Sequence, residues 1–285
     1  MLALARRPDV QSVGADIRTG PGFADLRVDL AFPAQSYAAV LAAKPDVVIN
    51  LAYLLAASCE ADPQRAVETN TAGVNGLFEA CHRLGVPRVV YASSGSVYGD
   101  QSVYGDRDVT EEEPLPPPRT LYQLMKQFNE VMAAHYNKRS TTRFIGLRLS
   151  SPHGRGKPGD PFDALVRAAA NGERNVALPF PSGRPLAFNY VDDSAELCAK
   201  VALSPSLRWD LYNQGGEPLT MEKLARIASD QAGVRATFDE NATKGTFMER
   251  ISSKRLEEEL GLTRRPAAEW FAQEVAESRT PRPVA

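Results

Sequence analysis

Residues that build metal centres and disulfide frameworks are scarce in this sequence. The 285 residues include three cysteines, Cys59, Cys81 and Cys198, and three histidines. Neither type falls at the spacings that hold a metal ion or that typify a disulfide framework. The composition therefore predicts no metal site and favours a reducing, cytoplasmic setting, in which thiols stay unpaired.

The sequence also lacks a large excess of positive or negative charge, and it lacks long apolar runs. The formal net charge is −2 at pH 7, which gives no electrostatic footprint for nucleic acid or for an anionic membrane. No apolar run approaches the ~18–20 residues of a transmembrane helix, and residues 1–8 lack the pattern of a secretory signal. We therefore expect a small molecule as the partner, rather than a nucleic acid or a membrane.

The remaining composition, 43% apolar and 24% charged, is ordinary for a soluble globular protein. Strand-like and helix-like runs alternate along the first half of the chain. The predicted strands cover 10–15, 23–29, 46–51, 88–93 and 143–149, and the predicted helices cover 36–43, 62–84 and 120–139. Such alternation predicts right-handed β-α-β units, and thus a doubly wound parallel sheet covered by helices.

The pattern changes after about residue 151. Helices are predicted over 163–171, 192–203 and 221–233, and short strands over 175–178 and 186–190. This mixture predicts a smaller α+β lobe beside the carboxyl edge of the sheet, where ligands of doubly wound folds bind. We accordingly divide the chain into residues 1–150, for the dinucleotide-binding type of sheet, and 151–285, for an interleaved substrate lobe.

One pair of residues carries the strongest chemical signal. Among nine tyrosines, only Tyr122 is followed four residues later by a lysine, Lys126. Four residues is close to one helical turn, so both side chains lie on one face of the predicted helix. An ammonium ~4 Å from a phenol would favour the phenolate by about 4 kcal/mol at an effective dielectric of ~20. The spacing also occurs on ordinary amphipathic helices with a surface lysine, so its meaning depends on context.

The context is an ordered series of motifs. Asp16 and Asp29-Leu30 follow two predicted strands, Asn50-Leu-Ala-Tyr53 ends a third, and Asn70 lies in the long helix. Ser93-Ser-Gly-Ser-Val-Tyr-Gly99 ends a fourth strand, and Tyr190-Val-Asp-Asp193 opens a later helix. With Tyr122 and Lys126, this order resembles the extended short-chain dehydrogenase/reductases, the NAD-dependent epimerase/dehydratase family, over roughly residues 8–265.

The resemblance implies a Rossmann-like fold and a set of cofactor residues. Asp16 would bond the adenosine ribose and favour NAD over NADP, although Arg18 keeps NADP possible. Asp29 and Leu30 would line the adenine pocket. Two further residues, Leu51 and Ala52, would approach the cofactor backbone, and Asn70 would tie the long helix to a neighbouring strand.

The resemblance also implies the chemistry. Tyr122 would be the acid/base, Lys126 would hold the nicotinamide ribose and lower the pKa of Tyr122, and Ser94 would be the catalytic hydroxyl. Gly95-Ser96 stands where dehydratases and decarboxylases carry extra carboxylates, so neither of those reactions is expected. The implied activity is oxidoreduction or epimerisation at a secondary alcohol or ketone.

The substrate positions depart from those of sugar-nucleotide enzymes. Ser151 and Leu186 stand where those enzymes resemble one another in an Asn and an Arg used on the diphosphate. Arg148, Arg155 and Arg184 could substitute for that clamp. We expect Ser94, Ser96, Ser151 and Arg184 to contact a small polar or sugar-like substrate, with a nucleotide-sugar epimerase as the alternative.

The family's opening strand and Gly-x-x-Gly-x-x-Gly loop have no counterpart, since the first glycine, Gly14, lies within a predicted strand. Helix amides of that loop hold the cofactor pyrophosphate, so weak NAD binding is expected of the chain as given. Either its reading frame starts too late, or it is a divergent member. A cofactor-free relative and an interaction protein built on the helices 62–84 and 120–139 remain alternatives, and those helices predict a homodimer.

Overall fold

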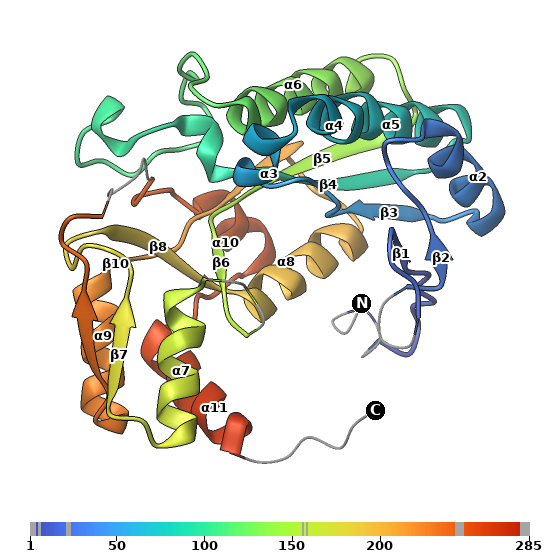
Figure 1. Cartoon of the computed structure of the whole chain (residues 1–285). Helices are drawn as coiled ribbons and strands as arrows, with labels where there is room; N and C mark the ends of the chain where they lie inside the picture. The colour runs from blue at the N-terminus through green and yellow to red at the C-terminus, as the bar shows by residue number, and fades with distance from the viewer. Residues whose placement is uncertain are drawn as a thin grey trace.

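The computed structural model describes residues 4, 7–20, 24–155, 157, 159–242 and 248–279. A four-stranded parallel sheet forms its centre (Figure 1). Its strands lie in the order β3 (Val47–Asn50), β4 (Arg88–Ser94), β5 (Arg143–Leu149) and β9 (Leu211–Gln214). Three of them coincide within two residues with predicted strands, which confirms the parallel α/β fold. Within the described ranges, no helix is both long enough and apolar enough to cross a lipid bilayer.

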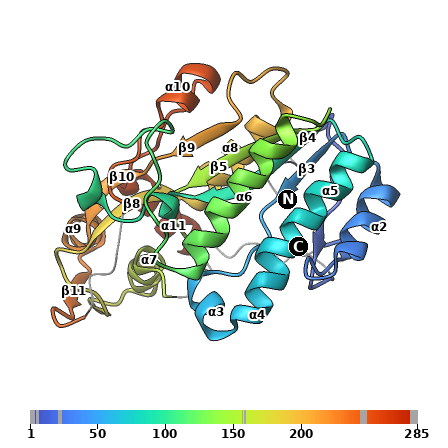
Figure 2. The same ribbon diagram turned by 90° about the horizontal axis from the view of Figure 1, so that it is seen from above.

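Helices cover both faces of this sheet (Figures 1 and 2). On one face lie α2 (Pro33–Ala43), α5 (Val74–Arg83) and α6 (Leu121–Asn137), and on the other lie α8 (Val191–Leu203) and α10 (Lys254–Leu260). Alternate residues of β4 serve the two layers: Val89 and Tyr91 pack with α5 and α6, whereas Val90 packs with α8. Burial on both faces explains why this strand is a continuous apolar run.

Two predicted strands are shorter than expected. The structure has β1 (Ala15–Asp16) and β2 (Leu26–Arg27), which pair with each other in parallel and not with the central sheet. Phe23, the predicted start of the second strand, lies outside the described residues. A strand that pairs along one edge only has half of the possible ladder bonds, which limits its regular length.

The predicted helix over 62–84 is not one regular helix. The structure has α3 (Ala56–Ala61), α4 (Pro63–Ala66), the π-helical segment η1 (Val67–Gly73) and then α5. The wider π turn changes the direction of the earlier side chains, so Val67 is 46% exposed. In α5 the regular α-helical spacing returns, and Val74, Leu77, Phe78 and Cys81 are buried.

The C-terminal lobe contains two small sheets and three helices. One sheet has β6 (Pro152–His153), β8 (Pro185–Tyr190) and β10 (Glu217–Thr220), and the other pairs β7 (Asn175–Leu178) with β11 (Arg235–Phe238). The helices are α7 (Pro161–Asn171), α9 (Met221–Ala232) and α11 (Ala267–Arg279). They pack on the buried rings of Phe162, Phe188 and Trp270. Because α8, β9 and α10 pack with the central sheet, the chain passes between the two parts more than once.

Close backbone packing fixes η1 against the loop after β2. A Cβ atom added to Gly73 would lie 2.3 Å from the carbonyl oxygen of Leu30. Gly73→Ala should therefore destabilise the protein by about 1–3 kcal/mol, because backbone atoms must move apart. Gly183→Ala is the control, since a Cβ there meets nothing within 4 Å. Equal free energies of unfolding for the two variants in urea titrations would contradict this account.

Candidate active site

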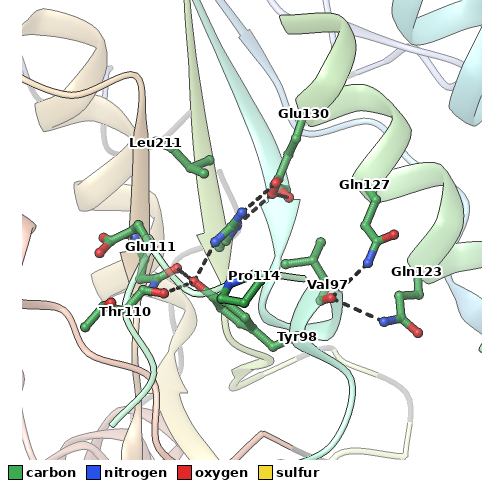
Figure 3. A network of polar contacts seen from close by, with 12 residues as sticks. Val97, Tyr98, Thr110, Glu111, Pro114, Gln123, Gln127, Glu130 and Leu211 are labelled. Atoms are coloured by element: carbon green, nitrogen blue, oxygen red, sulfur yellow. Dashed lines mark hydrogen bonds and ion pairs between the residues drawn. The ribbon is translucent and has the colours of Figure 1, made fainter. Parts of the chain in front are cut away.

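Polar side chains gather where β4 ends and α6 begins. After Ser94 the chain turns through two short 3-10 helices, η2 (Gly95–Tyr98) and η3 (Gln101–Val103). Helix α6 starts at Leu121, and the Thr120 side chain caps it by accepting the Gln123 amide. The glutamine side chain returns to the turn and donates to the Val97 carbonyl, as Gln127 also does (Figure 3). These bonds hold α6 against the carboxyl end of β4.

Lys126 points into the protein rather than to solvent. It is 2% exposed, and its Nζ atom donates to the Ala92 carbonyl oxygen at 2.6 Å. Nζ lies 5.6 Å from the centre of the Tyr122 ring, so the two residues share one side of α6 as predicted. Burial lowers the pKa of Lys126 to about 7, although the Glu130 carboxylate partly opposes this shift. The reading of Lys126 as a surface lysine is therefore wrong.

Tyr122 and Ser94 meet at this point. Burial raises the pKa of Tyr122, and a hydrogen bond with Ser94 opposes the rise. The pKa of Tyr122 stays above its ordinary value because loss of hydration outweighs the Ser94 hydrogen bond, and the expected lowering by Lys126 is not among the contributions to the shift. The Ser94 Oγ atom accepts the Ser96 amide at 3.1 Å, which directs its own proton away from that amide.

The sequence suggested no catalytic part for Tyr53, yet the structure places its ring beside both Tyr122 and Lys126. The Lys126 Nζ atom lies 3.3 Å from the centre of the Tyr53 ring. The Tyr53 and Tyr122 rings meet edge to face, with centroids 5.5 Å apart. Its place directly after the strand-end motif that begins at Asn50 was the available signal.

Asn70 ties η1 to the segment that follows β3. Its side chain accepts the Leu54 amide at 2.9 Å and donates to the Leu54 carbonyl at 3.0 Å. Asn129 of α6 in turn donates to the Asn70 carbonyl and to the Tyr53 hydroxyl, at 3.0 and 3.1 Å. Asn70 therefore ties η1 to the loop that follows β3, rather than to a strand as predicted, and it fixes the loop that carries Tyr53.

A buried ion pair lies one turn beyond Lys126. Glu130 accepts two hydrogen bonds from Arg148 at 2.9 and 2.7 Å, and a third from the Ser93 hydroxyl at 2.5 Å. Arg148 also donates to the Tyr98 hydroxyl at 2.6 Å. Figure 3 shows this network between α6 and the strands. Arg148 is 3% exposed and fully engaged, so its proposed use on a substrate diphosphate is wrong.

The residues expected to bind the adenosine end of the cofactor lie in different surroundings. Asp16 is half-buried at the end of β1 and accepts the Arg18 amide at 2.9 Å. Asp29 binds Arg65 at 2.6 Å. Burial favours a higher pKa for Asp29, but the Arg65 hydrogen bond brings it below its ordinary value. Leu30 packs in the core at 7% exposure, so only its backbone can face a ligand.

The residues expected to contact substrate are spread over the junction of the two lobes. The Ser96 hydroxyl is buried and has no hydrogen-bond partner, whereas Ser151 is exposed and accepts from Lys157 at 2.7 Å. Arg184 lies over the Phe180 ring, with its guanidinium carbon 4.2 Å from the ring centre. Neither these side chains nor Ser94 lines the two surface hollows found in the described part of the chain, one at Arg174 and one at Arg88.

Two other positions considered for a diphosphate clamp have internal roles. Arg155 pairs with Glu274 at 2.7 Å, and Leu186 is buried in the core of the C-terminal lobe. With Arg148 held by Glu130, two of the three arginines that could replace a diphosphate clamp are bound within the protein.

The parallel sheet, its two helical layers and the polar cluster at the strand ends define a Rossmann-like α/β protein. The chain belongs to the NAD dependent epimerase/dehydratase family, whose model matches residues 4–213. Among known structures, UDP-glucuronic acid 4-epimerase from Bacillus cereus, in complex with UDP-glucuronic acid and NAD, superposes with a TM-score of 0.80. That match has 19% identity and covers 98% of this chain and 94% of the other.

A second structural match is the GalE-like L-threonine dehydrogenase from Cupriavidus necator, with a TM-score of 0.79 and 19% identity. It covers 92% of this chain and 89% of the other. Among curated proteins, D-erythronate dehydrogenase of Cupriavidus necator is 30% identical over 162 residues, 55% of this chain and 48% of that protein. UDP-glucuronate 4-epimerase 1 of Arabidopsis thaliana is 29% identical over 143 residues, 48% of this chain and 32% of that protein. The chain thus spans about half or less of these curated relatives.

The burial of Lys126 predicts a pH dependence of stability. Its pKa is about 7 in the folded protein and 10.5 for an unperturbed lysine. Between these values the unfolded chain holds one more proton, so Lys126 makes the free energy of unfolding rise with pH. The wild type should gain about 1.4 kcal/mol per pH unit relative to Lys126→Met across this window. Lys138→Met, at the exposed end of the same helix, is the control, and parallel pH profiles for wild type and Lys126→Met would contradict the burial effect.

Proposed function

We propose that the protein is an NAD-dependent oxidoreductase or epimerase that acts at a secondary alcohol or ketone of a small polar or sugar-like substrate. The observation that carries this proposal is the meeting of Ser94, Tyr122 and Lys126 at the carboxyl edge of the sheet. Membership of the NAD dependent epimerase/dehydratase family supports it. So do the relatives, which by name include a dehydrogenase and a 4-epimerase.

The residues at this edge fit the two ends of a dinucleotide. Asp16 offers a carboxylate for ribose hydroxyls, and the ammonium of Lys126 has three hydrogens, of which Ala92 takes one. Ile17 and Leu51 are 57% and 55% exposed, which leaves apolar surface near the strand ends for a flat ring. Asp16 and Lys126 would therefore hold the riboses, with Leu51 and Ala52 beside the cofactor. When bound, NAD would supply or remove a hydride at the substrate carbon.

Tyr122 would move the proton at the substrate oxygen. Because burial raises the pKa of Tyr122, the phenol keeps its proton at neutral pH and can donate it to a carbonyl that is being reduced. The Ser94 hydroxyl stabilises the phenolate by hydrogen bonding, and a charged Lys126 on the same side of α6 would add to this once substrate and cofactor are bound. In the direction of alcohol oxidation, the hydrogen bond from Ser94 makes Tyr122 a better proton acceptor.

The polar side chains considered as substrate contacts favour a substrate smaller than a nucleotide sugar. Arg148 and Arg155 are held by internal carboxylates, and Leu186 is buried in the core. These positions therefore offer no cation for a diphosphate. Ser96 and Ser151, with Arg184, supply hydroxyl and guanidinium groups that suit hydroxyl and carboxylate groups of a hydroxy acid or sugar acid.

Replacing Tyr122 with Phe tests the proposal, since it removes only the hydroxyl. Turnover, followed as NADH formation over a panel of hydroxy acids and sugar acids, should fall by about 10²–10⁴-fold. Thermal stability should change little, and Tyr37→Phe on the exposed surface of α2 should keep full activity. Turnover at the wild-type rate in Tyr122→Phe would rule the assignment out. Failure of the wild type both to bind NAD and to form NADH would favour the cofactor-free alternative.

The outer face of α6 supports assembly into a homodimer. Leu124, Phe128 and Val131 are 49%, 40% and 67% exposed and follow the spacing of one helical face. Figure 2 shows α6 beside α5 on the outside of the sheet. A two-fold pairing of this face with a second copy would cover apolar side chains that otherwise meet water.

Light scattering should report a mass of about twice 31.0 kDa at micromolar concentration. Phe128→Glu should shift the protein to the monomer, because a carboxylate would be buried at the interface without a partner. Lys138→Glu at the helix end is the control for added negative charge. A wild type that stays monomeric on concentration would refute the interface.

A further inference from the structure

The ammonium of Lys126 rests on an aromatic face. Its Nζ atom is 3.3 Å from the centre of the Tyr53 ring, closer than its 5.6 Å separation from the Tyr122 ring. The side chain of Lys126 is almost fully excluded from solvent. An excluded ammonium lacks water as a partner, so an aromatic quadrupole at this distance is a strong substitute for hydration.

The ring of Tyr53 is held from two sides. Asn129, three residues after Lys126 on α6, donates to its hydroxyl at 3.1 Å. The next residue in the loop, Leu54, is clamped through both backbone polar groups by Asn70. The Tyr53 and Tyr122 ring planes are also nearly perpendicular, at 87°. Loop, η1 and α6 therefore fix one orientation of the ring relative to both acid–base residues.

The other groups near the Lys126 ammonium do not replace the Tyr53 ring as a partner for its charge. Ala92 of β4 accepts one of its hydrogens at 2.6 Å. Glu130 of the same helix is the nearest carboxylate along α6, but Arg148 and Ser93 already occupy its oxygens. Cys59 of α3 is fully buried and accepts from Asn70. Among the described residues, the Tyr53 ring is thus the closest uncommitted partner for the charge.

We propose that Tyr53 is a positioning residue of the acid–base site, which holds the charged form of Lys126 through its ring face and fixes the lysine beside Tyr122. This inference rests on the proposed function for its catalytic meaning. The interaction itself involves only the Lys126 ammonium and the Tyr53 ring. Loss of the ring face should favour the neutral form of Lys126, because the lysine would stay buried without the aromatic face that replaces its lost hydration.

A graded test lowers the electron density on the face of the ring at position 53 in steps, while the ring keeps nearly the same size. Tyr53→Phe, followed by mono-, di- and trifluorinated phenylalanine at the same position, withdraws electrons from the face in steps. The pKa of Lys126 is read in the full chain from the carbon-13 shift of labelled lysine side chains, with Lys126→Met to identify the signal. The pKa should stay near the wild-type value in Tyr53→Phe and fall stepwise by about half a unit to one unit in total.

Tyr53→Leu provides a second arm, because leucine fills much of the space but has no aromatic face. It should give a pKa at or below that of the trifluorinated variant. A flat series, or a leucine variant equal to Tyr53→Phe, would overturn the proposal and leave Tyr53 as packing only. Should the leucine variant fail to fold, the size-matched fluorinated series decides alone. No substrate or cofactor enters this measurement, so its outcome is separate from that of the Tyr122→Phe assay.

Discussion

The ion pair between Glu130 and Arg148 fixes the position of the site. It joins α6 to β5, and the Ser93 hydroxyl extends it to β4. The Tyr98 hydroxyl continues the network to Asn213 of β9 at 2.9 Å. Buried pairs of this kind add little net stability, but they are costly to break, because either charge left alone is poorly solvated. The network therefore selects one placement of α6 over the strands, and Tyr122 and Lys126 take their positions from that placement.

The inner face of α6 is unusual because polar side chains repeat along it. Tyr122, Lys126 and Glu130 follow one another at four-residue intervals, where an amphipathic helix would normally present apolar side chains. Glu130 is paired with Arg148, whereas Lys126, among the described residues, donates to the Ala92 carbonyl and lies on the Tyr53 ring face. Burial lowers the pKa of Lys126 to about 7, so the charge of this lysine depends on its surroundings near neutral pH.

Sequence patterns predicted those features of the fold that depend on interactions between residues close together in the chain. The buried strand 143–149 and the helix beginning near Tyr122 were predictable, because apolar burial and capping leave a signature within a few residues. Tyr122 and Lys126 could be paired because helical spacing is a short-range feature, and the family resemblance added Ser94 at the strand end. The contact of Tyr53 with Lys126 could not, since it joins segments far apart in the chain. Arg148 was misjudged because its partner Glu130 reads as part of a solvated helical face.

The π-helical segment within residues 67–73 limits how the chain can vary in length. It lets Asn70 reach the Leu54 backbone while α5 keeps its apolar face on the sheet. Removing one residue from this segment would rotate α3 and α4 by about 100° relative to α5. The loop that bears Tyr53 would lose its clamp at the same time. The contacts at its two ends therefore fix the number of residues in this helical segment.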